Sequence, residues 1–141
     1  PDGGWERDIW KMSRLGSVFQ TNAEDYFVVS RALWERLWEK AAVPPFVLGG
    51  VAFDNWFTGK MNNMKDVIVV DGTRTVTCLH QNHDSSIKHS HTKPKSVYNT
   101  NLANSHGSWS RGTVTDCAFF TRRHVDGTLS LGERWPRMLY D

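Results

Sequence analysis

The chain has 141 residues, of which 39% are hydrophobic and 23% charged, and its formal net charge is +2. This fits one domain over residues 1–141 and excludes two ordinary domains. Lysine and arginine residues are scattered except between residues 88 and 95, so we expect no nucleic-acid partner. No apolar run reaches the ~20 residues that span a bilayer, so we expect a soluble chain without a transmembrane segment. Nothing in the sequence indicates a compartment.

Residues 1–24 are mixed and polar, and we expect irregular structure there. Further along, Ser30 can cap a helix in which apolar residues recur at helical spacing. This helix should end by Val43, because the residue before a proline is disfavoured in the helical region. We expect Trp34 and Trp38 to lie on the buried stripe of the helix.

Pro44-Pro45 predicts an extended entry to the next segment, and Gly49-Gly50 permits a sharp turn. The turn leads into a second predicted helix over residues 51–64. Residues 66–70 form the clearest strand, and residues 73–79 alternate well enough to be its hairpin partner.

The segment 81–100 is rich in His, Ser, Lys, Asn and Thr, which predicts a long polar loop. We expect a short helix within residues 98–103 and a strand over residues 113–120. Cys78 and Cys117 each lie in a strand-like run, and two cysteines do not make a disulfide framework. We interpret both as buried thiols.

Asp54 follows the glycine turn near the start of a predicted helix and is flanked by aromatic residues. Partial desolvation would raise its pKa and suit it to act as a general base. The alternative is a carboxylate that only favours the helix dipole in the first turn. Spacing alone favours this second interpretation.

His80, His83 and Asp84 supply two imidazoles three residues apart and a carboxylate. Such ligands suit a divalent ion such as Mn²⁺ or Zn²⁺. The alternative is a histidine-rich surface loop, since no Cys pair or His-Glu-x-x-His pattern accompanies these residues.

Together, these motifs resemble the C-terminal half of a family of glycosyltransferase-like proteins with the GT-A nucleotide-diphospho-sugar transferase fold. The resemblance extends from about residue 22 to residue 120. Its most specific part is the run from His80 to Asp84, His-Gln-Asn-His-Asp. The other parts are Asp25-Tyr26-Phe27, Pro44-Pro45-Phe46, Gly49, Phe53-Asp54-Asn55-Trp56, Val70-Asp71, Tyr98-Asn99 and Leu102-Ala103.

The resemblance implies an α/β chain that forms the acceptor-side portion of a GT-A-like fold, with a short mixed sheet, two main helices and a long polar loop. The implied activity is transfer of a sugar from a nucleotide-diphosphate donor to an acceptor hydroxyl. By this likeness Asp54 would contact or deprotonate the acceptor. Phe53, Asn55 and Trp56 would line the acceptor site beside Gly49.

The resemblance also implies a divalent metal, Mn²⁺ or Mg²⁺, held by His80 or His83 near the diphosphate, with Asp84 adjacent. Gly50 departs from the family pattern, since an Arg usually occupies this position. No Asp-x-Asp motif is present either. We therefore expect a donor-binding half to precede Pro1, in a chain that begins without Met.

The alternative is a non-catalytic binding or structural module that uses its seven tryptophans and its histidine-rich loop on a carbohydrate or protein partner. Loss of Asp-x-Asp favours the module, whereas Asp54, His80 and His83 favour the enzyme lineage. A half-fold leaves apolar surface uncovered, so we expect a protein partner or self-association.

Overall fold

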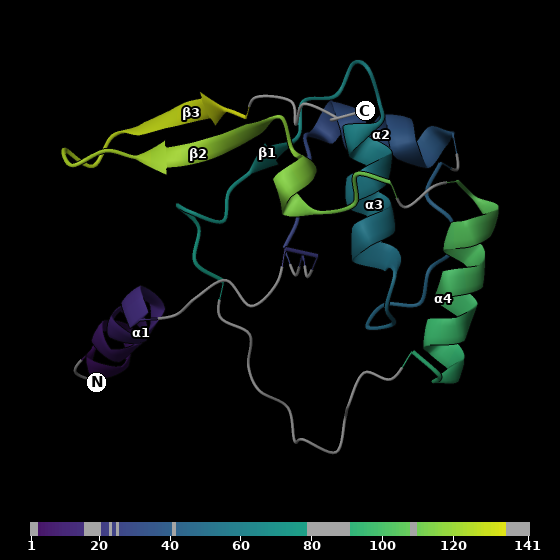
Figure 1. The fold of residues 1–141 in the computed structure, drawn as a ribbon, viewed down its shortest axis with the longest axis horizontal. Coiled ribbons are helices and arrows are strands. Elements are labelled where there is room, and N and C mark those ends of the chain that lie inside the picture. The colour runs from purple at the N-terminus through teal and green to yellow at the C-terminus, as the bar shows by residue number, and fades with distance from the viewer. Residues whose placement is uncertain are drawn as a thin grey trace, which may run out of the picture.

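The computed structural model describes residues 3–15, 21, 22, 24, 26–40, 42–78, 91–107 and 110–134. Over these residues the chain is a mixed α/β structure with four α-helices and a small three-strand sheet (Figure 1). In order, the elements are α1 (Gly4–Leu15), α2 (Arg31–Glu39), α3 (Phe53–Asn62), β1 (Val70–Asp71), α4 (Pro94–Ser105), the 3₁₀ turn η1 (Val114–Asp116), β2 (Phe119–Arg123) and β3 (Leu129–Glu133).

Two helices agree with the sequence prediction. Helix α2 begins after Ser30, whose hydroxyl oxygen accepts a hydrogen bond from the Leu33 backbone N–H at 3.3 Å. It ends at Glu39, well before the prolines. Helix α3 occupies most of the predicted range 51–64, and Asp54 lies in its first turn.

The sheet has the order β1-β2-β3, with β1 parallel to β2 and β2 antiparallel to β3. Val70 pairs with Phe119, which lies 49 positions later in the sequence. The parallel ladder therefore joins two segments that are far apart along the chain. Phe120 lies over Gly132, where an added Cβ would meet the phenyl ring at 2.5 Å. A glycine at this position therefore lets the edge of the Phe120 ring approach the backbone of β3.

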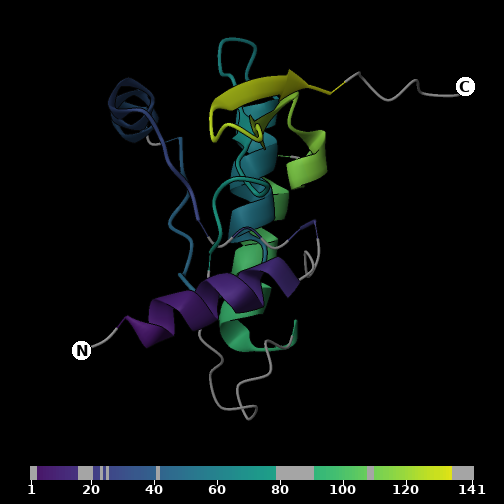
Figure 2. The ribbon, with the colours of Figure 1, turned by 90° about the vertical axis from the view of Figure 1, so that its left-hand side faces the viewer.

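The core lies between α2, α3 and α4. Leu37, Ala52, Trp56, Phe57, Met61 and Ala103 are buried in it. Aromatic rings of Phe27, Phe46 and Phe53 pack around its edge. Figures 1 and 2 both place α3 beside α4, and Figure 1 shows α1 apart from these two helices. Burial of these large rings is the main favourable contribution to folding here.

Several sequence predictions about the N-terminal half need correction. The irregular structure expected over residues 1–24 is replaced by helix α1 at Gly4–Leu15, none of whose residues is buried. Trp34 and Trp38 are 49% and 74% exposed, because the inward stripe of α2 is formed by Leu33 and Leu37 instead. The described chain therefore has two further helices, α1 and α4, besides the two main helices that were predicted.

The predicted hairpin between residues 66–70 and 73–79 is wrong over the described residues. The Asp71 carboxylate accepts a hydrogen bond from the Thr73 N–H, and the Gly72 carbonyl accepts from Thr75 and Val76. These bonds form a tight turn in place of a ladder. The strand is only Val70–Asp71, and its partner is β2.

The strand predicted over residues 113–120 is also wrong in its first half. Thr113 and Asp116 form a capping box that closes η1, in which the Asp116 carboxylate accepts from the Thr113 N–H at 3.0 Å. The strand begins at Phe119. The end of the loop predicted over residues 81–100 is helical from Pro94, and residues 81–90 lie outside the described residues.

Candidate functional site

The turn before α3 places Asp54. Gly49 has φ +70°, and Ala52 has φ 84°, a left-handed conformation that is rare for a residue with a side chain. These two positions reverse the chain so that α3 starts at Phe53 with Asp54 in the first turn. A half-buried carboxylate thus lies beside a strained turn and near the positive end of a helix dipole.

A buried side chain on α4 holds this turn. The Asn99 Oδ1 accepts a hydrogen bond from the Val47 N–H at 2.9 Å, and its Nδ2 donates to the Val47 carbonyl at 2.9 Å. Asn99 is 0% exposed. The neighbouring Tyr98 hydroxyl donates to the Pro45 carbonyl at 3.3 Å. Helix α4 therefore fixes the backbone of the entry segment from two consecutive residues.

Gly50 packs directly against Asn99, the side chain that holds this turn. A Cβ added at Gly50 would lie 2.6 Å from Asn99 Nδ2 and 3.2 Å from the Lys95 carbonyl. A side chain at this position would therefore require Asn99 or α4 to shift. A cation is nevertheless close by, because a Cβ added at Gly49 would lie 3.5 Å from Lys95 Nζ.

The residues predicted to line an acceptor site have different surroundings. Phe53 is half-buried and contacts the rings of Phe27, Phe46 and Phe57. Trp56 is 1% exposed and packs on Phe46, with ring centroids 5.1 Å apart. The buried indole belongs to the core and offers no face to a ligand in this conformation.

Asn55 has a structural role in the same helix turn. Its Nδ2 donates to the backbone carbonyls of Asn22 and Gly112, both at 2.9 Å, and contacts the Glu24 carboxylate at 3.3 Å. The Asn55 amide therefore joins three separate segments. Of the four consecutive residues from Phe53 to Trp56, only Trp56 is buried, and the other three remain partly exposed.

The predicted metal ligands His80, His83 and Asp84 lie outside the described residues. Within the part of the chain that the structure describes, no group of three or more His, Cys, Asp or Glu side chains could hold a metal ion. The same part contains no helix with the length and apolar character needed to cross a bilayer.

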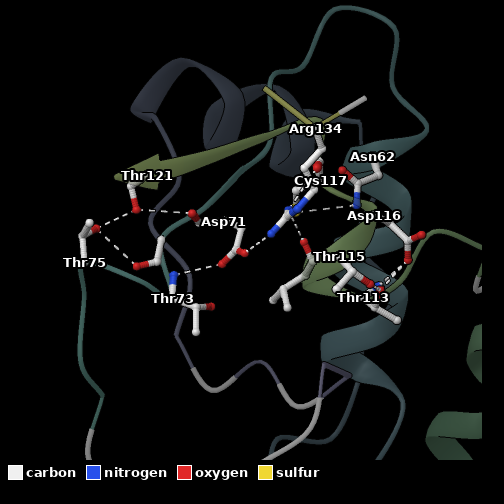
Figure 3. Close-up of polar contacts among 12 residues, drawn as sticks. Asn62, Asp71, Thr73, Thr75, Thr113, Thr115, Asp116, Cys117, Thr121 and Arg134 are labelled. Carbon is white, nitrogen blue, oxygen red and sulfur yellow. Dashed lines mark hydrogen bonds and ion pairs between the residues drawn. The ribbon is translucent and has the colours of Figure 1, made fainter. Parts of the chain in front are cut away.

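Asp71, the acidic residue at the end of β1, is the centre of a second polar cluster (Figure 3). Arg134 donates to its carboxylate at 2.5 Å and also to the backbone carbonyls of Val114 and Cys117. Burial acts to raise the pKa of Asp71, but hydrogen bonds from Thr73 and Arg134 outweigh it, and the pKa is lowered. The cluster joins β1 to η1 and to the end of β3.

The two cysteines differ in their environments. Cys117 is buried as predicted, and burial raises the pKa of its thiol. Cys78 is exposed, which corrects the prediction of two buried thiols. The short strand β1 ends before Cys78, so no sheet covers this residue.

Sequence reasoning missed Lys95 as part of the candidate site. The signal for Asn99 was its place in the Tyr98-Asn99 motif, but its partner Val47 is 52 positions away. Lys95 lay within a segment interpreted as a loop, so its position on α4 was not visible. Scans against protein-family models, curated proteins and solved structures gave no match for this chain.

Proposed function

We propose that this chain is the acceptor-side portion of a GT-A-like glycosyltransferase, which transfers a sugar from a nucleotide-diphosphate donor to an acceptor hydroxyl. Asp54 is the residue that contacts the acceptor in this proposal. Phe53 forms an apolar edge of the same site, and Gly49 forms its turn. The proposal rests on the motif resemblance together with the packing around Asp54.

One observation carries the proposal. Motif residues from three separate segments pack together at the turn that precedes Asp54. Asn99 from the Tyr98-Asn99 motif binds the backbone of Val47, just after the Pro-Pro-Phe motif. Phe46 of that motif packs on Trp56 from the Phe-Asp-Asn-Trp motif. The contacts between these motifs support the proposal, because they bring the motif residues to the turn that carries Asp54.

The chemistry follows from a half-buried carboxylate in the first turn of α3. Asp54 would accept the proton of the acceptor hydroxyl while the hydroxyl oxygen forms a bond to the anomeric carbon of the donor. The bond from that carbon to the diphosphate breaks, and the nucleotide diphosphate leaves with the electron pair. Lys95, close to Gly49, supplies the positive charge where the family usually has an Arg.

The donor side of the reaction belongs to residues outside those described. We propose that His80 and His83 hold Mn²⁺ or Mg²⁺, whose positive charge offsets the charge of a leaving diphosphate. Calorimetric titration with Mn²⁺ and then UDP or GDP tests this part. Nucleotide binding that needs the metal and disappears in His80→Ala supports the metal proposal. Equal binding by wild type and His80→Ala contradicts it.

The acceptor proposal is tested by calorimetric titration of the chain with uncharged methyl glycosides of galactose, N-acetylglucosamine and mannose. We expect one of them to bind and Asp54→Asn to weaken it about tenfold, since a charge-assisted hydrogen bond is lost. Asp8→Asn is the matched control, because Asp8 is an exposed carboxylate on α1. Binding unaffected by Asp54→Asn would contradict the role of Asp54.

A second candidate function is a non-catalytic binding module, and exposed rings on α2 favour it. Trp34 and Trp38 stack with centroids 6.2 Å apart and an interplanar angle of 25°. An exposed aromatic platform of this kind suits a sugar ring or a protein surface. Loss of glycan binding in Trp38→Ala, with Asp54→Asn unchanged, would favour the module over the transferase.

A further inference from the structure

A wide groove of about 1320 Å³ lies between α1 and the sheet side of the molecule. One wall is α1, and the other is the segment after β1 with the end of β2. Figure 1 shows α1 below the β2–β3 hairpin and next to the segment that follows β1. The charged residues of the lining are Glu6, Arg7, Lys11, Arg14, Arg74 and Arg123.

Five of these six charges are positive. Arg7, Lys11 and Arg14 follow one another at spacings of four and three residues, so they share one face of α1. That face is turned toward the groove, whereas Trp5 and Met12 of α1 are exposed and do not line it. Glu6, Trp10 and Leu15 line the groove as well, so this wall of α1 combines three cations with one carboxylate and apolar surface.

The opposite wall is also basic and is held in place by neutral contacts. The Arg74 guanidinium lies 4.9 Å from the centroid of the Phe120 ring, and Arg123 donates to the Thr75 carbonyl at 3.5 Å. Among the described residues, no carboxylate forms an ion pair with any of the five groove cations. Their charges are thus left without a partner inside this part of the chain.

Two positive walls that face each other repel, and an anion between them removes this repulsion. We propose that the groove binds a linear sulfated glycan of the heparin type. Its volume exceeds the 300–1,000 Å³ or so of a usual small-molecule site, so a chain-like ligand fits it better. Thr77 also lies in the lining, and its hydroxyl can donate to a sulfate or sugar oxygen.

A sulfated glycan fits this lining better than a single-stranded nucleic acid. Single-strand binding sites combine a basic groove with several aromatic rings on which successive bases stack. Among the described residues that line this groove, Trp10 is the single aromatic one. The proposal involves none of the residues around Asp54, so it is independent of the transferase proposal.

The test is titration of the 141-residue chain with a heparin octasaccharide at about 0.05 M NaCl, where ionic contacts are weakly screened. We expect binding, with an affinity that falls steeply as salt is added. The double variant R7Q/R14Q changes the helix wall, and R74Q/R123Q changes the sheet wall. Each should raise Kd about tenfold or more and make the salt dependence shallower, since two ionic contacts are lost.

The matched control is R31Q/K65Q, which removes the same charge from exposed positions outside the groove. It should leave Kd within about twofold of wild type, since distant exposed charges are screened. Because R7Q/R14Q changes only exposed positions on α1, the test does not depend on whether R74Q/R123Q folds. Absence of heparin binding, an equal loss in the control, or tighter binding of a 12-residue oligouridylate would overturn the proposal.

Discussion

Asn99 and Val47 exchange two hydrogen bonds, each 2.9 Å long, between a fully buried carboxamide and one backbone residue. The side chain thus replaces the partner that a neighbouring strand would supply to Val47. Since an extended segment before α3 has no strand beside it, this pair fixes where the segment runs. The position of Gly49, and of Asp54 after it, depends on the pair.

We predict that Asn99→Ala lowers the free energy of unfolding by about 2–4 kcal/mol, because a fully buried side chain is truncated and both of its hydrogen bonds to the Val47 backbone are lost. Urea unfolding measured by circular dichroism checks this value. Asn101→Ala is the control, since Asn101 is exposed on the same helix and its loss should cost less than about 0.5 kcal/mol. Similar losses in the two variants would contradict the role of Asn99.

Gly50 should tolerate no side chain. Gly50→Ala places a Cβ against Asn99 and the Lys95 backbone, so we expect a loss of about 1–3 kcal/mol from forced displacement. Gly72→Ala is the control, because an added Cβ there would meet only the Val76 side chain at 3.7 Å. Thermal unfolding of both variants gives the comparison. If Gly50→Ala is as stable as Gly72→Ala, α4 can move away from the added Cβ at little cost. That result would contradict the prediction.

The Asp71 and Arg134 pair predicts a pH dependence of stability. Burial acts to raise the pKa of Asp71, but bonds from Thr73 and Arg134 hold it below its ordinary value. A lowered pKa stabilises the fold above the unfolded-state value of about 3.9, and this contribution is lost as the pH falls through the folded-state pKa. Asp71→Asn should therefore cost about 2–4 kcal/mol at neutral pH.

The cost of Asp71→Asn should shrink as the pH falls below about 4, because Asp71 of the unfolded chain is then protonated, and it should disappear once the pH is below the lowered folded-state pKa. Urea unfolding of wild type, Asp71→Asn and the exposed control Asp8→Asn across this range measures it. A cost for Asp71→Asn that is the same at neutral and acid pH would mean that the Asp71 charge does not stabilise the fold.

The two thiols should react at different rates. Cys78 is exposed, whereas Cys117 is buried. Burial raises the pKa of the Cys117 thiol, so Cys117 stays protonated and unreactive. We expect iodoacetamide to modify Cys78 first in the native chain, with Cys117 reacting only on unfolding. Peptide mass analysis identifies the site, and Cys78→Ser should remove the fast reaction. Fast modification of Cys117 would place that thiol at the surface.

Local signals were enough to predict α2 and α3. The cap at Ser30 and the proline pair define one helix, and the glycine turn defines the start of the other. Helix α1 was missed because its apolar residues, such as Trp5, Ile9 and Met12, stand within a polar composition and contribute nothing to the core. The spacings of four and three residues between Trp5, Ile9 and Met12 are nevertheless helical, so the sequence carried a signal for α1.

Long-range pairings could not be predicted. The parallel ladder of Val70 with Phe119 competes with a hairpin that the local sequence also permits, and bonds within the turn at Gly72 decide between them. In the candidate site, the glycine pair predicted the turn at Gly49. The hydrogen bonds from Asn99 to Val47, by contrast, depend on how α4 packs. The burial of Trp56 also follows from that packing, and its side-chain type alone gave no indication of it.

The most direct test of the central claim is a map of amide chemical shifts for the ¹⁵N-labelled chain during titration with the uncharged methyl glycosides. An acceptor site at the turn before α3 predicts that the largest shifts occur at Gly49, Gly50, Asp54 and Lys95, and that Asp54→Asn reduces them. Shifts confined to Trp34 and Trp38 on α2, or no shifts with any of the three glycosides, would contradict an acceptor site at Asp54.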